Sequence, residues 1–341
     1  MVKKKINFMK KVMIVAEIGN NHEGSFIQAK KLIQKAAQSG VDAVKFQTFK
    51  TEEFINDTDQ KKYKRYEKFE LTKEEFYKLS KFAKSKKLIF ISTPLDIQSA
   101  IYLNKCVDYF KISSGDNNYF QLIEKVLSFK KPVIISTGLL NHSGIKDILR
   151  FIKKKKFPMK KLFLLHCVSD YPVEDKEANL ISIKYLRDKF KINIGYSDHT
   201  LGVEASIMAV TYGSKIIEKH FTLDKGYSNF RDHKLSADPD EMSKLVKSVR
   251  RSSAMVGMYT KTISKNEKKN FNSMRRSLYA KVQINKGEKI TLNKIKLVRP
   301  HNLISPKKIN KFLNKKAKSL IKKSQAINLK SVWIKKNFID V

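Results

Sequence analysis

The sequence predicts an α/β protein, a (β/α)₈ barrel followed by a small carboxy-terminal domain. Eight short apolar runs recur at roughly the spacing of one strand plus one helix, and each ends in a polar or ionisable residue. Helical periodicity fills the segments between the runs. In a barrel of parallel strands, the carboxyl ends of the strands meet at one face, and that face carries the chemistry. The pattern therefore predicts an enzyme.

The apolar runs are the predicted strands because they are short and bounded by turn residues. They cover residues 12–18, 43–46, 88–91, 109–112, 133–135, 162–165, 192–196 and 216–217. The polar residues at or just past their ends are Glu17, Lys45, Gln47, Thr93, Lys111, Ser114, Ser136, Thr137, His166, Ser169, Ser197, His199 and His220. Between the first two runs, one helical face carries Ala29, Leu32, Ile33 and Ala36. We expect the strand-end residues to converge on the catalytic face.

Two long connections interrupt the alternation of predicted strands and helices. The first, residues 48–87, is polar until Thr72-Lys73-Glu74-Glu75, which has the form of a capping box and begins a helix. A long loop on the catalytic face is a candidate lid. The second is a charged loop over residues 221–240, and it leads into the last barrel helix, expected from about residue 238 to 256.

A change of pattern after that helix predicts a separate domain. Residues 1–260 are assigned to the catalytic barrel and the polar residues 261–274 to a linker. Over residues 275–341 short segments alternate with turns such as Lys286-Gly287-Glu288. We expect a small domain of mixed strands and turns there.

Net charge is the unusual feature of the composition. The chain has 341 residues, of which 41% are hydrophobic and 30% charged, and its formal net charge is +39. Such a charge is typical of nucleic-acid binding, and a basic protein that binds nucleic acid or anionic glycans is one alternative. The lysines, however, are spread along the whole chain, and no basic motif interleaved with aromatic residues stands out. We favour a lysine-rich solvated surface, whose positive field attracts anionic substrates.

Cysteine usage and the amino terminus predict a cytoplasmic protein without a membrane partner. Cys106 and Cys167 form no CxxC pattern, so buried reduced thiols are expected. The amino terminus is basic, but the apolar run that follows is short and contains Glu17. Neither a signal peptide nor a membrane span is expected.

Two histidines are the candidate metal ligands. His199 and His220 end neighbouring strands, so both imidazoles should reach one divalent ion in the barrel mouth. Two histidines plus water and a substrate oxygen suit Mn²⁺, Zn²⁺ or Fe²⁺ and leave positions open for Lewis-acid work. The alternative is that each imidazole hydrogen-bonds a neighbouring carboxylate, Asp198 or Glu218.

Lysine and serine side chains at the strand ends are the candidate anion site. Lys45, Lys111, Ser114, Ser136 and Ser197 would form a ring of cations and hydroxyl donors able to hold a phosphate and a carboxylate. Each lysine alone could be a solvated charge. Both lysines nevertheless lie in apolar strands, where an unpaired ammonium is costly, so an anionic partner is expected.

Glu17 is the candidate general acid or base. It lies in the apolar run Val15-Ala16-Glu17-Ile18-Gly19, where burial favours the protonated carboxyl unless a cation is near. The alternative is that Glu17 forms a structural ion pair with Lys45 on the next strand.

Taken together, these motifs resemble those of the sialic acid synthases, the N-acetylneuraminate synthase family. The resemblance rests on residues 16–22 (AEIGNNH), 45–47 (KFQ), 92–96 (STPLD), 111–116 (KISSGD), 136–138 (STG), 165–172 (LHCVSDYP), 195–200 (GYSDHT) and 218–225 (EKHFTLDK). Residues 275–279 (RRSLY) and 298–300 (VRP) are similar to the antifreeze-like (SAF, β-clip-type) domain of these enzymes.

The resemblance implies a reaction and its cofactor. The family condenses phosphoenolpyruvate with an N-acylated hexosamine, typically N-acetylmannosamine, to a nine-carbon 2-keto-3-deoxy sugar acid and phosphate. His199 and His220 would hold Mn²⁺, with Mg²⁺ or Co²⁺ as alternatives. Sister synthases that make legionaminate, pseudaminate or a spore-coat sugar differ only in the substituents of the hexosamine.

The resemblance also implies residue roles and a partner. Glu17 and Asp116 would be the site carboxylates, and Asp116 stands where bacterial members usually have Glu. The substrate-binding residues would be Lys45, Gln47, Thr93, Lys111, Ser114, Ser136, Ser169, Tyr171, Ser197 and Asp232. A domain-swapped homodimer is expected, in which Arg299 reaches the sugar site of the partner subunit.

Overall fold

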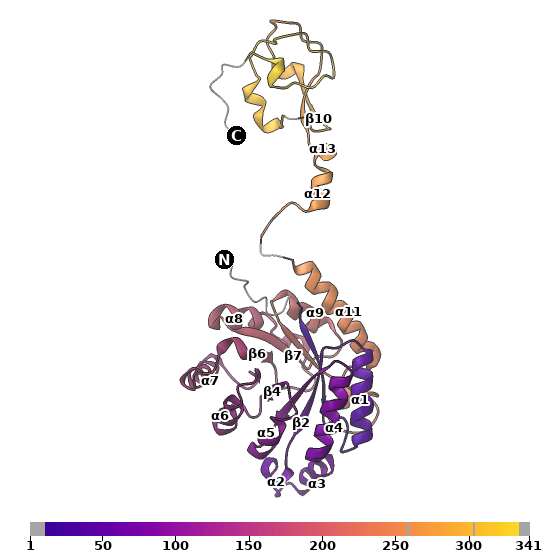
Figure 1. Cartoon of the computed structure of the whole chain (residues 1–341). Helices are drawn as coiled ribbons and strands as arrows, with labels where there is room; N and C mark the ends of the chain where they lie inside the picture. Colours follow the sequence, from indigo (N-terminus) through magenta and orange to yellow (C-terminus); the bar gives the residue numbers. More distant parts are fainter. Residues whose placement is uncertain (1–10, 258–259, 303, 334–341) are drawn as a thin grey trace. The chain divides into compact units, whose positions relative to one another are not determined.

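The computed structural model describes residues 11–257, 260–302 and 304–333. The chain divides into two compact units, Met1–Gly257 and Met258–Val341 (Figure 1). Residues 1–10 and 334–341, which the sequence assigns to the two predicted domains, lie outside the described residues.

The first unit is a closed barrel of eight parallel strands in sequence order (Figure 1), which confirms the predicted fold class. The strands are β1 (Met13–Gly19), β2 (Ala43–Thr48), β3 (Ile89–Pro94), β4 (Tyr109–Ile112), β5 (Val133–Ser136), β6 (Leu162–Cys167), β7 (Asn193–Asp198) and β8 (Ile216–His220). Pairing of β8 with β1 closes the barrel. Most strands continue one to three residues past the predicted apolar run, so several candidate site residues lie inside strands.

Helices surround the barrel, and their apolar faces cover the outside of the strands (Figure 1). They are α1 (Phe26–Gln38), α4 (Lys73–Ser85), α5 (Ile97–Leu103), α6 (Phe120–Ser128), α7 (His142–Lys154), α8 (Ile181–Phe190), α9 (Glu204–Thr211) and α11 (Pro239–Val256). The predicted face of α1 is buried at Ala29, Leu32, Ile33 and Ala36. Both predicted helix starts are confirmed, because Thr72 and Asp238 each form a capping box. Short 3₁₀ turns η1 (Met159–Lys161) and η2 (Asp175–Glu177) lie in the loops around β6.

The connection over residues 48–87 is more ordered than its polar sequence suggests. It contains α2 (Thr51–Phe54) and α3 (Gln60–Phe69) before α4, where the sequence predicted a polar loop. Aromatic packing explains the difference, since Phe49, Phe54 and Tyr66 lie within about 5.5 Å of one another, centroid to centroid. Phe69 packs edge-on against Phe230 at 5.2 Å. The two long connections therefore meet through aromatic residues, and the second contains a short helix, α10 (Arg231–Leu235).

The second unit has its own apolar core, built around Leu278, Phe312 and Ile321. Its strands β9 (Ser277–Ala280) and β10 (Ile295–Val298) pair antiparallel. The segment predicted as a linker contains α12 (Lys265–Lys269) and α13 (Phe271–Met274), and 3₁₀ turns follow at η3 (Leu292–Lys294), η4 (Pro306–Lys311) and η5 (Leu329–Ser331). Gly287 occupies the predicted turn with φ of +80°, a conformation that favours glycine.

Both cysteines, Cys106 and Cys167, are unpaired and buried. Within the described ranges, no helix combines the length and apolarity needed to span a bilayer.

Candidate functional site

Strand alternation directs most of the predicted residues into the barrel. An apolar cluster that includes Val15, Ala43, Ile91, Ile134 and Leu165 fills the barrel interior, separate from the core between strands and helices. Side chains alternate along a strand, so residues two or four positions further on point the same way. These residues are Glu17, Lys45, Gln47, Thr93, Lys111, Ser136, Cys167, Ser197, Glu218 and His220. A polar layer therefore lies above an apolar floor at the carboxyl ends of the strands.

The same alternation corrects one expectation. His166 follows Leu165, which points inward, so its side chain lies on the outer face of β6. Its ring stacks on Tyr196 at 5.8 Å, and its Nε2 is 2.9 Å from the carbonyl oxygen of Ala178. His166 fixes a loop and does not converge on the mouth.

Four buried charges occupy the centre of the polar layer. Lys45 Nζ lies 2.9 Å from Glu17 Oε1 and 3.6 Å from Glu218 Oε1, and Lys111 Nζ lies 3.0 Å from Glu218 Oε1. Each of the four side chains is at most 5% exposed. The ion pair between Glu17 and Lys45, weighed as an alternative from the sequence, is present. The anionic partners expected for Lys45 and Lys111 are, within the protein, the carboxylates of Glu17 and Glu218.

Two hydroxyls complete this cluster. Ser197 Oγ donates to Glu218 Oε1 at 2.9 Å, and Lys45 Nζ donates to Thr93 Oγ1 at 3.3 Å. Backbone register accounts for the proximity, because Glu17 pairs with Lys45 across β1 and β2 and Ser197 pairs with Glu218 across β7 and β8. Six consecutive strands of the closed barrel, β7, β8, β1, β2, β3 and β4, thus contribute to one hydrogen-bonded group.

The two carboxyls of the cluster differ in proton affinity. Burial raises the pKa of Glu17 to about 7, and the nearby Glu218 adds to this effect while Lys45 opposes it. Burial also disfavours the Glu218 carboxylate, but Lys111 and Lys45 outweigh it and hold the pKa of Glu218 well below its usual range. Glu17 Oε2 is buried without a hydrogen-bond partner. Near neutral pH, Glu17 can exchange a proton and Glu218 stays an anion.

The two predicted metal histidines lie side by side. Their ring centroids are 5.5 Å apart, and Tyr171 stacks on His199 at 4.2 Å. His199 Nδ1 is 2.8 Å from the carbonyl oxygen of Val168, which requires the proton on Nδ1 and leaves a lone pair on Nε2. Neither ring hydrogen-bonds Asp198 or Glu218, so that alternative is wrong. Asp198 points outward instead, where it pairs with Lys219 at 3.2 Å.

Burial keeps both imidazoles neutral, the form that coordinates metals. It lowers the pKa of His199 to about 4 and that of His220 well below its usual value. His220 Nδ1 is buried without a hydrogen bond and lies 4.0 Å from Asp232 Oδ2. The residues therefore fit a divalent ion held by two imidazoles. Within the described ranges, no group of three or more His, Cys, Asp or Glu side chains is placed to hold a metal.

Small residues make room for hydroxyls beside the histidines. A Cβ atom on Gly138 would collide with Ser114 Oγ and Ser169 Oγ, so both hydroxyls face this glycine. Ser169 Oγ is buried without a partner, and Ser114 Oγ lies 3.7 Å from Cys167 Sγ. Ser136, also buried, ends β5 on the inward side. The predicted serines therefore gather in the mouth.

The remaining predicted residues lie around this centre or outside it. Gln47 accepts a hydrogen bond from Asn20 Nδ2 at 2.8 Å, beside Gly19, whose φ is +53°. Asp116 is half-buried in the loop after β4 and accepts from Ser113, and none of its hydrogen bonds reaches the four buried charges. Asp232 in α10 is buried and pairs with Arg231. Arg299 lies in the second unit, at a cavity of about 500 Å³ that Arg275, Arg276 and His301 also line.

Sequence reasoning missed Glu218 as a site residue. The predicted eighth strand ended at the first ionisable side chain, whereas β8 continues to His220. The signal was available, because Glu218 and His220 are two residues apart on one strand and must share a face.

Comparisons with known proteins agree with this architecture. A family model described as NeuB family matches residues 32–261, and a SAF domain model matches residues 275–331. The chain belongs to the NeuB family. An N,N'-diacetyllegionaminic acid synthase of Campylobacter jejuni is 38% identical and covers 94% of this chain and 99% of its own. An N-acetylneuraminate-9-phosphate synthase of Mus musculus is 32% identical over 82% of this chain and 81% of that protein.

A solved structure extends the agreement to three dimensions. The N-acetylneuraminic acid (sialic acid) synthetase of Leptospira borgpetersenii, in complex with citrate, aligns with a TM-score of 0.72 and 35% identity. It covers 76% of this chain and 90% of that one. The resemblance seen in the sequence and the expectation of an enzyme are confirmed, and this NeuB family member is a carbon–carbon bond-forming transferase.

Proposed function

We propose that the enzyme condenses phosphoenolpyruvate with an N-acylated hexosamine, giving a nine-carbon 2-keto-3-deoxy sugar acid and phosphate. The observation that carries the proposal is the pairing, in one barrel mouth, of a buried cluster of two lysines and two glutamates with two neutral histidines. Family membership supports it, because relatives with this fold are named as legionaminic and sialic acid synthases.

In this proposal Lys45 and Lys111 bind the phosphate and carboxylate of phosphoenolpyruvate. Their ammoniums are buried and held in place by Glu17 and Glu218, so little rearrangement is needed when the substrate binds. Ser197 donates to Glu218 within this cluster, and the hydroxyls of Ser114 and Ser169, which face Gly138, are proposed as additional donors.

His199 and His220 would hold the divalent ion, for which we propose Mn²⁺, with Mg²⁺ or Co²⁺ as alternatives. When bound, such an ion supplies Lewis-acid polarisation to the aldehyde oxygen of the acceptor. The Val168 carbonyl fixes the His199 tautomer, and Tyr171 restricts its ring. Asp232 lies 4.0 Å from His220, and burial raises the pKa of its carboxyl, so in this proposal it gives a proton to the aldehyde oxygen as that oxygen becomes a hydroxyl.

The reaction forms one carbon–carbon bond and breaks one carbon–oxygen bond. Carbon 3 of phosphoenolpyruvate attacks the aldehyde, the cationic carbon 2 takes up water, and the resulting adduct expels phosphate with its bridging oxygen. Glu17 is the group best placed to accept the proton of that water, because its pKa is near neutrality and its Oε2 has no hydrogen-bond partner. Lys111 and Lys45 stabilise the departing phosphate.

The acceptor remains a choice among closely related sugars. Legionaminate, pseudaminate and spore-coat sugar synthesis share the reaction and differ in the substituents on the hexosamine. Incubation with phosphoenolpyruvate, Mn²⁺ and a panel of N-acylated hexosamines, followed by mass detection of the product, tests the proposal directly. We expect stoichiometric release of phosphate with one acceptor. Retention of DNA in a salt-dependent manner, with no phosphate released from any acceptor, would instead favour the nucleic-acid alternative.

A further inference from the structure

A buried ion pair lies on the outer face of the barrel strands that carry the two histidines. Asp198 ends β7, Lys219 belongs to β8, and the two residues pair across these strands. Asp198 Oδ2 lies 3.2 Å from Lys219 Nζ, and the two side chains are 0% and 1% exposed. His220 points into the barrel, so Lys219, one position earlier, points outward towards the helices.

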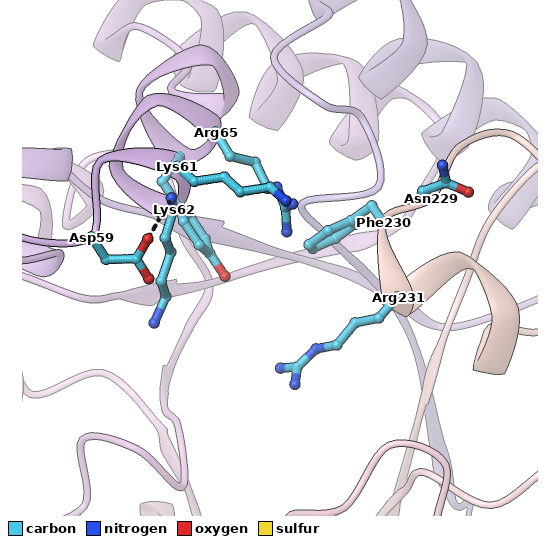
Figure 2. Close-up of a pocket in the computed structure, with 8 residues that line it drawn as sticks. Asp59, Lys61, Lys62, Arg65, Asn229, Phe230 and Arg231 are labelled. Atoms are coloured by element: carbon cyan, nitrogen blue, oxygen red, sulfur yellow. Dashed lines mark hydrogen bonds between the residues drawn. The ribbon is translucent and has the colours of Figure 1, made fainter.

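Complete burial is exceptional for a cation in this protein. The cationic side chains of α3 that line a cavity of about 430 Å³ in Figure 2, such as Lys61 and Arg65, are exposed. Among the lysines and arginines that the structure describes, only Lys45, Lys111 and Lys219 are buried. The first two belong to the polar layer of the mouth, whereas Lys219 lies in the largely apolar core between strands and helices.

Stability alone does not account for a charged pair in this place. Burying two charges costs free energy of desolvation, and well-packed apolar side chains of similar volume often replace such a pair without loss of stability. The other known use of a buried polar group is to fix one arrangement of the chain. The hydrogen bonds of the pair indicate which arrangement it fixes.

The pair holds both backbone polar groups of Thr200. Asp198 Oδ1 accepts from the backbone N–H of Thr200 at 2.9 Å and from its hydroxyl at 2.8 Å. Lys219 Nζ donates to the carbonyl oxygen of Thr200. Ser206 of α9 donates to Asp198 Oδ2 at 2.6 Å, which fixes the carboxylate from the helix side. Asp198 and Lys219 therefore join β8, α9 and the residue that follows His199.

Both candidate metal ligands are direct neighbours of this network. His199 lies between Asp198 and Thr200 in the chain, and His220 follows Lys219. Asp198 and Lys219 form the last pair of the β7–β8 ladder, so His199 lies just past the paired strands. The bond from Lys219 to Thr200 carries the connection one residue further, from the strand of His220 to the segment of His199. The two rings, with centroids 5.5 Å apart, are thus linked through the outer face.

We propose that Asp198 and Lys219 are positioning residues for the metal site, and that they set the separation of His199 and His220. The inference rests on the proposed function and adds two residues that touch neither the ion nor a substrate. Groups that orient metal ligands from outside the coordination shell change metal affinity by about 10- to 100-fold when they are removed. The affinity for the divalent ion should therefore depend on this pair.

Titration of the full chain with Mn²⁺, followed by electron paramagnetic resonance, tests the proposal. The test variant is the double substitution Asp198→Asn with Lys219→Met, because a single substitution would leave one buried charge without its partner. Residue 198 can still accept from Thr200 in this variant, whereas the link from β8 is lost. We expect the Kd for Mn²⁺ to rise about tenfold or more. Far-UV circular dichroism verifies that the variant is folded under the conditions of the titration.

The matched control is Asp42→Asn at the other end of the barrel. Asp42 also combines an ion pair, with Arg250, and a hydrogen bond to strand backbone, from the N–H of Ile14 at 2.9 Å. It precedes β2 and is remote from the strand ends that carry the histidines. This change should lower stability while the Kd for Mn²⁺ stays within about twofold of that of the unaltered chain.

Several outcomes would overturn the proposal. A folded double variant whose Kd stays within about twofold of the unaltered value would do so, as would an equal rise of the Kd in Asp42→Asn. If the double variant does not fold, Lys219→Gln replaces it, since glutamine keeps a donor for Asp198 but has a shorter reach towards Thr200. The same rise in Kd is expected for this variant, and an unchanged Kd contradicts the proposal.

Failure of the proposed metal site is a separate result. If the unaltered chain binds no Mn²⁺, that part of the proposed function fails, and the positions of the rings are then compared in metal-free protein. Nuclear magnetic resonance of chains with ¹³C-labelled histidine rings makes the comparison. Displaced signals of His199 and His220 in the double variant, with the other histidine signals unmoved, support positioning by the pair. Unchanged signals of these two rings overturn it.

Discussion

Removing the negative charge of Glu218 should destabilise the barrel more than removing the charge of an exposed side chain. The substitution Glu218→Gln keeps the size of the side chain and leaves Lys45 and Lys111 buried with Glu17 as the only carboxylate between them. Loss of one partner from a buried ion pair costs about 3–5 kcal/mol, because the remaining charge is desolvated without compensation. Lys111 can limit that cost by releasing its proton, since burial already lowers its pKa. We therefore expect a loss of about 3 kcal/mol near neutral pH.

Urea unfolding of the full chain, followed by far-UV circular dichroism, measures the effect. Tryptophan fluorescence is unsuitable, because the single tryptophan, Trp333, lies in the second unit. The matched control is Asp147→Asn, which breaks an ion pair with Arg150 at 3.0 Å whose side chains are 53% and 69% exposed. That change should cost less than about 1 kcal/mol.

A double substitution sharpens the test. Glu218→Gln combined with Lys111→Met removes both charges of the closest pair, so the double variant should be more stable than Glu218→Gln alone. A loss for Glu218→Gln no larger than that of the exposed control would refute the reasoning, because it would mean that water already solvates the four charges.

Three further predictions concern activity. His220→Ala should reduce the rate by roughly 10² or more and abolish binding of Mn²⁺ measured by electron paramagnetic resonance, whereas full activity after chelation without added metal would exclude a metal role. Lys111→Met should raise the KM for phosphoenolpyruvate far more than that for a neutral acceptor, because an ammonium pairs with an anion, and equal effects on both would make Lys111 structural. An Arg299→Ala chain mixed with a His220→Ala chain should regain activity if Arg299 completes the site of the partner subunit. Mixed chains that exchange subunits and remain inactive would exclude that arrangement.

The fold and the placement of most strand-end residues in the mouth could be predicted from the sequence. Both depend on the alternation of inward and outward side chains along each strand. A strand that ends in a polar residue two positions after an inward apolar one places that residue in the mouth, as at Ile91 and Thr93. The same rule, applied to His166, would have placed it outside. His166 was misplaced because the end of the apolar run was used to predict which side chains reach the mouth. The face of the strand on which each side chain lies was not considered.

What the sequence could not supply depends on partners that are distant along the chain. Helix α3 has few apolar residues, and its order comes from packing of Phe69 on Phe230. Strand pairing could bring Lys45 near Glu17, since β1 and β2 are consecutive, but the distances that make Glu218 the shared anion require the closed barrel. The role that the resemblance implies for Arg299 would involve a second chain, which no pattern within one chain specifies.

Glu17 predicts a pH dependence of stability opposite to that of an ordinary ion-paired carboxylate. Burial, the largest influence, and Glu218 raise its pKa in the folded protein from 4.5 to about 7, against the effect of Lys45 and Lys111. The folded state therefore binds the proton more tightly than the unfolded state, and this contribution to stability is complete below pH of about 4.5 and is lost as pH rises towards 7. The buried histidines, whose pKa values are lowered, contribute a slope of the opposite sign to every variant, so the test is a difference between two chains. Urea unfolding of the chelator-treated proteins should show the free energy of unfolding of the unaltered chain falling across that window relative to that of Glu17→Gln. Stability that rises with pH across the same window in the unaltered chain, with the slope unchanged in Glu17→Gln, would show that the carboxyl is solvated or fully neutralised by Lys45 and would remove it as the proposed proton acceptor.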